Sequence, residues 1–497
     1  MNDRIVETQS GKVRGMVQEG TARFLGIPYA APPVGLLRFA VPEAPAPWSG
    51  VRDALEPGPN APQPRARNLP GLDVFALVGE GWVEGDDYLT LNIWAPDGQA
   101  SGLPVMVFVH GGAFVLGSKD VALHDGSAFA HDGAVCVAIN YRMGTEGFLP
   151  IPKIPTNLGL RDQIFAIQWV RDNVCAFGGD PDNITVFGES AGAMSIANLI
   201  ASPLATGLFR RAIVQSGHGG MTRDMGVAQR LVKKLAKIAG ISPNEAGYRS
   251  KSAGDLIAAV EKVNLPTTRL DLRDRDGREP VFGISRFVPV HGDDVLPLPP
   301  LEALAQGEGA DIDLLIGTNA EEMNLYFVPT NIKAKLGRLL STYIMHRSVP
   351  KANRLLKAYG MGQQGVKPSQ AFTDAATDVV FRWPARRFAE EHRGRTHVYE
   401  FDWRSPRFAE QGGLGASHGM ELPFVFDTLS TVSGPEGLCG ESPPQELANC
   451  VHRIWLDFAR DGSLPWGEFT RDQRLVHHLA REETVTEPPM PAAPFLP

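Results

Sequence analysis

Short apolar runs, each followed by glycine or polar residues and then by helical periodicity, constrain the fold of this chain more than any other feature. Residues 105–109, 135–139, 184–187, 212–214 and 314–316 are almost continuously apolar. Strands that are buried on both faces have this composition, because helices cover both sides of their sheet. The pattern predicts an α/β fold with a mostly parallel central sheet and helices on both faces.

The remaining segments indicate one large domain over residues 1–497. Residues 161–174 and the stretch from 192 to 200 have helical spacing of apolar residues. Segments 222–282 and 330–375 have no strand-and-turn punctuation, so we expect helical insertions there. Residues 56–85 are rich in Pro, Gly and Asn and predict a long surface loop.

Composition excludes several classes of protein. The chain has 497 residues, 43% of them hydrophobic, with 48 basic and 56 acidic residues and a net charge of −8. This is globular composition, and its overall charge predicts neither a nucleic-acid partner nor a membrane partner. No run approaches the about 20 apolar residues that a membrane span needs. The sequence does not indicate an oligomeric state.

The N-terminal residues and the cysteines predict a cytoplasmic location. Residues 1–10 lack the basic start and apolar run of a signal peptide. The four cysteines form no Cys-x-x-Cys pair, so we expect neither structural zinc nor a disulfide framework.

The pentapeptide Gly188-Glu189-Ser190-Ala191-Gly192 is the strongest chemical signal. A serine hydroxyl is a weak nucleophile unless it is held in the open beside a base. A tight strand-to-helix turn holds it there, and glycines at its ends avoid steric clashes. A plain glycine-rich turn is the alternative, but the motif follows a buried strand and precedes a helix. We therefore predict that Ser190 is a nucleophile.

A second glycine-rich segment, residues 110–114, ends an earlier strand with the sequence His-Gly-Gly-Ala-Phe. Acyl transfer needs two or three N–H donors aimed at one oxygen, and small residues let the main chain approach that closely. The N–H groups of Gly112, Ala113 and Ala191 are therefore predicted to form an oxyanion hole. We expect the imidazole of His110 to be structural.

A base and an acid should follow the serine in the chain. His418 lies in a glycine-rich loop beyond the strand-like residues 398–401, where a doubly wound hydrolase places its base. The pair His477-His478 is a weaker candidate, because only a surface-like stretch precedes it. Glu321 and Glu322 follow the strand at 314–316, and spacing alone does not choose between them.

Ordered motifs from one end of the chain to the other carry a family resemblance. They are Gly26-Ile27-Pro28-Tyr29-Ala30, Leu91-Asn92-Ile93, His110-Gly111-Gly112, Asn140-Tyr141-Arg142, Phe177-Gly178-Gly179-Asp180-Pro181, the serine pentapeptide, Gln215-Ser216-Gly217, Gly317-Thr318-Asn319 and His418-Gly419. The sequence resembles the type-B carboxylesterase/lipase family of α/β-hydrolases, which includes cholinesterases and bacterial para-nitrobenzyl esterases. This resemblance implies an α/β-hydrolase fold with helical insertions over the active site. The sequence contains no nucleotide-binding glycine motif after a strand and no His-Glu-x-x-His, so we expect no cofactor or metal.

The resemblance also implies residue roles. Ser190 would be the nucleophile, Glu322 the acid and His418 the base. The residues that support these three would be Glu189, Ser216 and Asp378. Of these, Ser216 and Asp378 would support the loop that carries His418. A structural ion pair between Arg38 and Asp86 is implied as well.

These features predict a serine carboxylesterase that hydrolyses small-molecule esters of short to medium acyl chain through an acyl-enzyme. A binding protein that kept the hydrolase scaffold is one alternative, since fold does not settle function. The same machinery acting on amides or carbamates is another, and a preference for long emulsified lipids would indicate a lipase. Choline esters are not expected, because Trp82 is out of register with the tryptophan of choline sites.

Overall fold

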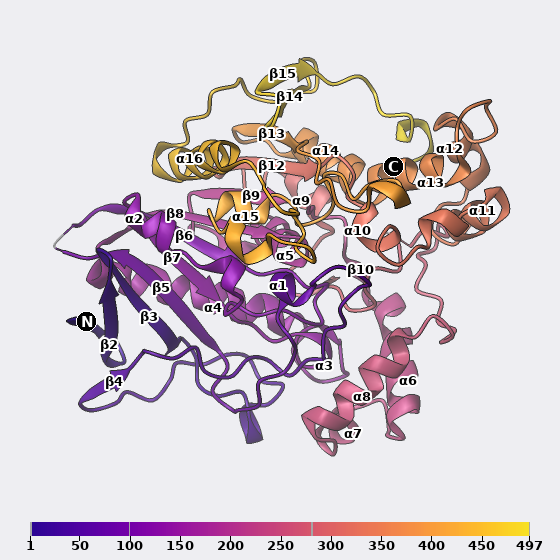
Figure 1. The fold of residues 1–497 in the computed structure, drawn as a ribbon. Coiled ribbons are helices and arrows are strands. Elements are labelled where there is room, and N and C mark those ends of the chain that lie inside the picture. Colours follow the sequence, from indigo (N-terminus) through magenta and orange to yellow (C-terminus); the bar gives the residue numbers. More distant parts are fainter. Residues whose placement is uncertain (1, 99, 280–281, 497) are drawn as a thin grey trace.

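The computed structural model of the chain describes residues 2–98, 100–279 and 282–496 (Figure 1). Its main sheet has the strand order β1-β2-β3-β5-β7-β6-β8-β9-β12-β13-β14-β15, with β4 beside β2. The strands are β1 (Asn2–Thr8), β2 (Gly11–Gln18), β3 (Thr21–Pro28), β4 (Val51–Asp53), β5 (Thr90–Pro96), β6 (Leu103–Val109), β7 (Val135–Ile139), β8 (Gly179–Glu189), β9 (Arg211–Gln215), β12 (Asp313–Asn319), β13 (Thr396–Phe401), β14 (Leu475–His478) and β15 (Glu483–Thr486); β10 (Arg223–Asp224) and β11 (Val290–His291) form a separate pair.

The middle of the main sheet is parallel, as the apolar runs predict. Strands β7, β6, β8, β9, β12, β13 and β14 pair with one another in parallel. Strands β1, β2, β3 and β5 at one end, and β15 at the other, pair antiparallel. The carboxyl ends of the parallel strands share one edge, and this edge carries the residues of the site.

Apolar side chains fill both faces of the sheet. Along β6, Val105, Val107 and Val109 belong to one hydrophobic cluster, while Met106 and Phe108 belong to another. Alternate residues of a strand point to opposite faces, so each cluster is the core of one face. The first core includes residues of α4 and α5, and the second includes residues of α2 and α16. The prediction of helices on both faces is confirmed.

Helices occupy both segments for which insertions are expected. The α-helices are α1 (Phe75–Val78), α2 (Ser127–His131), α3 (Gly144–Phe148), α4 (Leu158–Asn173), α5 (Ala191–Ile200), α6 (Met225–Ala239), α7 (Glu245–Arg249), α8 (Ala253–Asn264), α9 (Pro300–Gln306), α10 (Asn324–Phe327), α11 (Arg338–His346), α12 (Ala352–Ala358), α13 (Pro368–Thr377), α14 (Trp383–Glu391), α15 (Leu422–Val425) and α16 (Gln445–Asp461). Figure 1 shows α6 to α8 and α11 to α13 on the right of the view, away from the antiparallel strands. Between α13 and α14 the chain forms one π-helical turn, η6 (Asp378–Arg382).

The expectation that Arg38 pairs with Asp86 is wrong. The guanidinium of Arg38 bonds the carboxylate of Glu146 instead, with Nη2 2.6 Å from Oε1, and it also donates to the carbonyl of Lys251. Glu146 is buried in α3, whereas Asp86 is exposed. A buried carboxylate needs a cation more than an exposed one does, and this need explains the choice of partner.

Candidate active site

Ser190 lies at the turn between β8 and α5, with φ +55° and ψ −123°. Its N–H donates to the carbonyl of Gln215 on the neighbouring strand β9, at 2.9 Å. A Cβ on Gly192 would lie 1.9 Å from the carbonyl oxygen of Val109, and one on Gly188 would lie 2.5 Å from the same oxygen. The glycines are therefore required because the end of β6 approaches the turn, and not only because of the turn itself.

The structure brings His418 and Glu322 to Ser190. The Nε2 atom of His418 is 2.8 Å from Oγ of Ser190, and its Nδ1 is 2.7 Å from Oε2 of Glu322. A carboxylate accepts only, so Nδ1 carries the proton and Nε2 is left to accept from the serine hydroxyl. The three side chains are at most 9% exposed, so the hydrogen bonds are largely shielded from water.

Glu322 is held by its second carboxylate oxygen. Its Oε1 accepts from the hydroxyl of Ser216 at 2.7 Å and from the N–H of Asn319 at 2.7 Å. Ser216 therefore reaches the histidine through Glu322. The contribution of Asn319 was missed at the sequence level, although its place at the end of β12 was the available signal.

The neighbouring acid, Glu321, has a different partner. Its Oε2 accepts from the N–H of Ala416 at 2.7 Å, and its own N–H donates to the carbonyl of Ala416 at 2.8 Å. Gly415 has φ +65°, and a Cβ there would lie 2.5 Å from Oε2 of Glu321. Glu322 thus bonds the imidazole, while Glu321 bonds the main chain of the loop that carries it.

Glu189 adds a third carboxylate close to the histidine. Its Oε1 is 3.1 Å from Nε2 of His418, and burial raises the pKa of Glu189 above its usual range. For His418, burial disfavours the charged ring, but the carboxylates of Glu189 and Glu322 outweigh this effect and raise its pKa. The site therefore favours the imidazolium that forms when His418 accepts a proton.

Aromatic rings from the chain on either side of the second insertion pack against His418. The ring of Phe381, in η6, is 4.7 Å from the imidazole between centroids, and that of Tyr326, in α10, is 5.7 Å away. No motif pointed to either residue. Asp378 also lies in η6, but its carboxylate accepts from Tyr359 at 2.5 Å and from Arg382 rather than from the histidine loop.

Arg382 links this segment to the acid. Its guanidinium donates to the carbonyl of Ala320 at 2.8 Å and pairs with Glu400 at 2.9 Å. Any support that Asp378 gives therefore passes through Arg382 to the loop of Glu321 and Glu322.

The segment predicted to supply oxyanion donors folds back beside Ser190. Gly112 has φ +113°, where a Cβ would lie 1.8 Å from the carbonyl of Leu116, and a Cβ on Gly111 would lie 3.2 Å from Cβ of Ser190. Ala113 also has positive φ, and its carbonyl accepts from the hydroxyl of Ser285 at 2.6 Å. Ala191 is the first residue of α5, where an N–H has no partner within the helix.

Tyr141 and Gln63 hold the chain at His110 and at Gly117, on either side of the predicted donors. The amide of Gln63 accepts from the N–H of Gly117 at 2.8 Å and donates to its carbonyl at 2.9 Å. The hydroxyl of Tyr141 donates to the carbonyl of His110 at 2.7 Å, and the two rings stack at 4.5 Å. Burial lowers the pKa of His110 to about 4, so its ring is neutral at pH 7 and serves a structural role.

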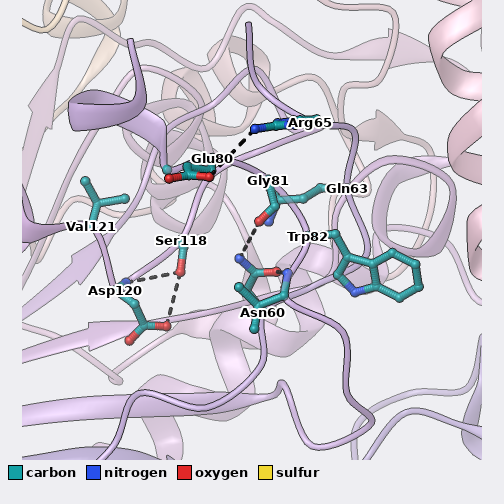
Figure 2. A pocket seen from close by; sticks show the side chains of 11 residues that line it. Asn60, Gln63, Arg65, Glu80, Gly81, Trp82, Ser118, Asp120 and Val121 are labelled. Carbon is teal, nitrogen blue, oxygen red and sulfur yellow. Dashed lines mark hydrogen bonds and ion pairs between the residues drawn. The ribbon is translucent and has the colours of Figure 1, made fainter. Parts of the chain in front are cut away.

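Two cavities flank these residues. One, of about 560 Å³, is lined in part by Asn60, Gln63, Trp82 and Ser118, and Figure 2 shows Asn60 bonded to Gly81 and Ser118 bonded to Asp120. The other, of about 930 Å³, is lined in large part by residues of the first insertion, with the chain that follows Ser216 and with Ser348 and Val349 from the second insertion. Neither lining includes Ser190, His418 or Glu322.

The described residues contain neither a candidate metal site nor a candidate membrane span. No group of three or more His, Cys, Asp or Glu side chains there could hold a metal ion. No helix among them is long and apolar enough to cross a membrane.

Comparison with known proteins places this geometry in a family. The model of the carboxylesterase family matches residues 2–488. The chain is a carboxylesterase family member. The para-nitrobenzyl esterase of Bacillus subtilis (strain 168) is 35% identical and covers 98% of this chain and 97% of its own length. The phenmedipham hydrolase of Pseudarthrobacter oxydans is 34% identical, with 95% and 94% covered.

A solved structure of a para-nitrobenzyl esterase is similar throughout, with a TM-score of 0.83, 32% identity and 100% of both chains covered. The family and these relatives make this chain a serine carboxylesterase, a carboxylic ester hydrolase with the α/β-hydrolase fold.

Proposed function

We propose that this carboxylesterase hydrolyses its esters with Ser190 as nucleophile, His418 as base and Glu322 as the acid that orients it. The observation that carries the proposal is the continuous chain of hydrogen bonds from the serine hydroxyl to His418 and on to Glu322, at 2.8 and 2.7 Å. The N–H groups of Gly112, Ala113 and Ala191 stabilise the oxyanion.

The reaction proceeds in two halves. His418 takes the proton of Ser190 as the oxygen attacks the carbonyl carbon, and the tetrahedral intermediate expels the alcohol, which receives that proton. Water then loses a proton to His418 and attacks the acyl-enzyme, and the serine leaves with the proton returned. Glu322 holds the imidazole in the required tautomer and stabilises its cation in both halves.

The substrate that we propose is a small ester of short to medium acyl chain, taken up without a cofactor. The burial of Ser190 and the packing of Phe381 and Tyr326 against His418 support a site reached by small molecules rather than by nucleic acid. We also propose one catalytic domain over residues 1–497, with insertions at 222–282 and 330–375. The four free cysteines support a cytoplasmic location.

The deciding experiment is Ser190→Ala. We expect kcat on para-nitrophenyl butyrate to fall by about 10⁶-fold with an unchanged circular dichroism spectrum, because the nucleophile is lost and the fold is not. A fluorophosphonate probe should label the native protein and not the variant. Wild-type turnover by the folded variant would refute the assignment, and a native protein that resists the probe would favour a binding role.

A series of para-nitrophenyl esters, from acetate to palmitate, tests the chain length. We expect the highest kcat/KM between acetate and octanoate. Phenmedipham is a further compound to include, because one relative is named for its hydrolysis. An optimum at palmitate would show that the proposed acyl range is wrong.

A further inference from the structure

Charge is unevenly distributed along this chain. Residues 323–373 contain eight basic residues and neither Asp nor Glu, although the whole chain has a net charge of −8. Seven of these basic side chains are exposed, and none of the seven forms an ion pair with a described residue: Lys335, Arg338, Arg347, Lys351, Arg354, Lys357 and Lys367. The eighth, Lys333, is buried and bonded to Asn324.

Exposed apolar side chains are interleaved with these cations. Ile332 is 39% exposed, Leu339 88%, Leu340 43% and Tyr343 64%. Leu339 and Tyr343 are four residues apart on α11 and share one face of the helix. Together with the seven exposed cations, these four side chains form what we call the basic apolar surface.

The basic apolar surface lies on the segment between Tyr326 and Phe381, the two residues whose rings pack against His418. Figure 1 shows α11 and α12 at the outer edge of the molecule. Helix α11 packs on α12 and α13, and α13 leads directly into η6, whose Phe381 contacts His418. The inner end of the same segment carries Tyr326, beside the same imidazole.

We propose that the basic apolar surface docks this carboxylesterase on an anionic lipid bilayer. A helix that presents cations together with Leu and Tyr suits the lipid interface, where apolar side chains enter the acyl boundary and cations meet anionic headgroups. The charge of the whole chain predicts no such partner, because a sum over all residues hides a local excess of one sign.

Two other occupants fit the surface less well. A second copy in a symmetric contact would bring two sets of unpaired cations together, which is unfavourable. Nucleic acid would use the cations, but it gains little from exposed Leu and Ile side chains, since its bases stack on aromatic rings.

Vesicle co-sedimentation of the full chain tests the proposal. We expect binding to vesicles of phosphatidylcholine and phosphatidylserine (7:3) at 0.1 M NaCl, at least tenfold weaker binding to phosphatidylcholine alone, and loss of binding at 0.5 M NaCl. The double variant Leu339→Ser/Tyr343→Ser and the single variant Arg338→Glu should each weaken binding by about tenfold or more. The Ser190→Ala variant should bind as the native chain does, so this test is independent of the catalytic assignment.

Matched controls change the same chemistry elsewhere. Leu36→Ser alters a side chain that is 92% exposed, and Arg453→Glu reverses an exposed charge on α16, away from α11 in Figure 1. Neither should change binding, and all of these surface variants, unlike Ser190→Ala, should keep the native rate on a soluble ester. The proposal is overturned if anionic vesicles are not bound, or if Leu339→Ser/Tyr343→Ser binds normally. It is also overturned if Tyr343→Ser converts a dimer to a monomer in sedimentation velocity, or if a single-stranded oligonucleotide binds as tightly as the vesicles do.

Discussion

Glu322 uses both of its carboxylate oxygens, one toward His418 and the other toward Ser216 and Asn319. Glu321, the preceding residue, bonds only the main chain of the histidine loop and the exposed side chain of Arg404. An amide can replace a carboxylate that accepts a single main-chain hydrogen bond, but it cannot enforce the histidine tautomer.

The two adjacent acids therefore provide a matched pair of variants. We expect Glu322→Gln to lower kcat by about 10⁴-fold, because the amide stabilises the wrong tautomer and gives no charge to the imidazolium. Glu321→Gln should lower kcat by less than about tenfold, since its oxygen still accepts from Ala416. Steady-state kinetics on para-nitrophenyl butyrate, with circular dichroism to check folding, measures both. Equal losses would contradict the division of roles.

The carboxylate of Glu189, close to His418, leads us to predict a shift in the pH profile of kcat/KM when it is replaced. This carboxylate helps to raise the pKa of His418, and the base must be neutral to act. Glu189→Gln removes that charge, so the pKa of His418 falls and the ring remains neutral to lower pH. We expect the acid limb of kcat/KM to move to lower pH. Asp97→Asn, an exposed acid, should leave the limb in place, and an acid limb that moves upward in Glu189→Gln would refute the argument.

At the scale of elements, the loop of residues 56–85 holds the oxyanion segment through one side chain. Gln63 makes two hydrogen bonds to the same residue, Gly117, as a neighbouring strand would. Gly117 in turn touches Gly111, because a Cβ on Gly117 would lie 2.4 Å from the Gly111 carbonyl. The position of the predicted donors thus depends on a distant loop.

We expect Gln63→Ala to lower kcat by about 10- to 100-fold with a smaller change in KM, because donors that are no longer fixed stabilise the oxyanion poorly. The affinity for a trifluoromethyl ketone, whose adduct carries an oxyanion, should fall in parallel. Asn60→Ala is the control, since Asn60 bonds Gly81 and Val83 in the same loop and not the oxyanion segment. A loss of thermal stability alone, with normal kinetics, would contradict this role.

The elements differ in how well the sequence predicts them. The parallel strands are predictable, because strands buried on both faces must be apolar at nearly every position. Strand β1 is not, since its sequence Asn-Asp-Arg-Ile-Val-Glu-Thr is mostly polar. The stretch before His477 is mostly exposed, as its sequence predicts, but His477 itself is buried in β14 and stacks on Trp466 at 4.3 Å, a contact set by tertiary packing.

The residues of the active site also differ in how well the sequence predicts them. Ser190 and His418 are predictable because their chemistry requires a particular turn and loop. Glu321 and Glu322 are not separable by spacing, because a turn can aim either of two consecutive side chains at a histidine 96 residues further on. Phe381 and the Arg38–Glu146 pair depend on how insertions pack, which no local pattern encodes.

At the scale of the whole molecule, stability comes from the two apolar cores and not from cross-links. All four cysteines are free, and two of them, Cys136 and Cys439, are buried. Burial raises the pKa of both thiols, which keeps them in the unreactive protonated form.

We therefore expect 5 mM dithiothreitol to change the melting temperature of the native protein by less than about 1 °C. A disulfide is typically worth about 2–4 kcal/mol, and its reduction would shift the transition by several degrees. Differential scanning fluorimetry with and without the reductant is the measurement. A clear drop in the melting temperature would reveal a cross-link that the native fold depends on.

The approach of the Val109 carbonyl to Gly188 and Gly192 has a consequence for anyone who redesigns this enzyme. Crowding by a side chain can be relieved by trimming that side chain, but a peptide oxygen in a central strand has no smaller replacement. Library design should therefore hold both glycines constant and vary the loop of residues 56–85 and the two insertions to change selectivity.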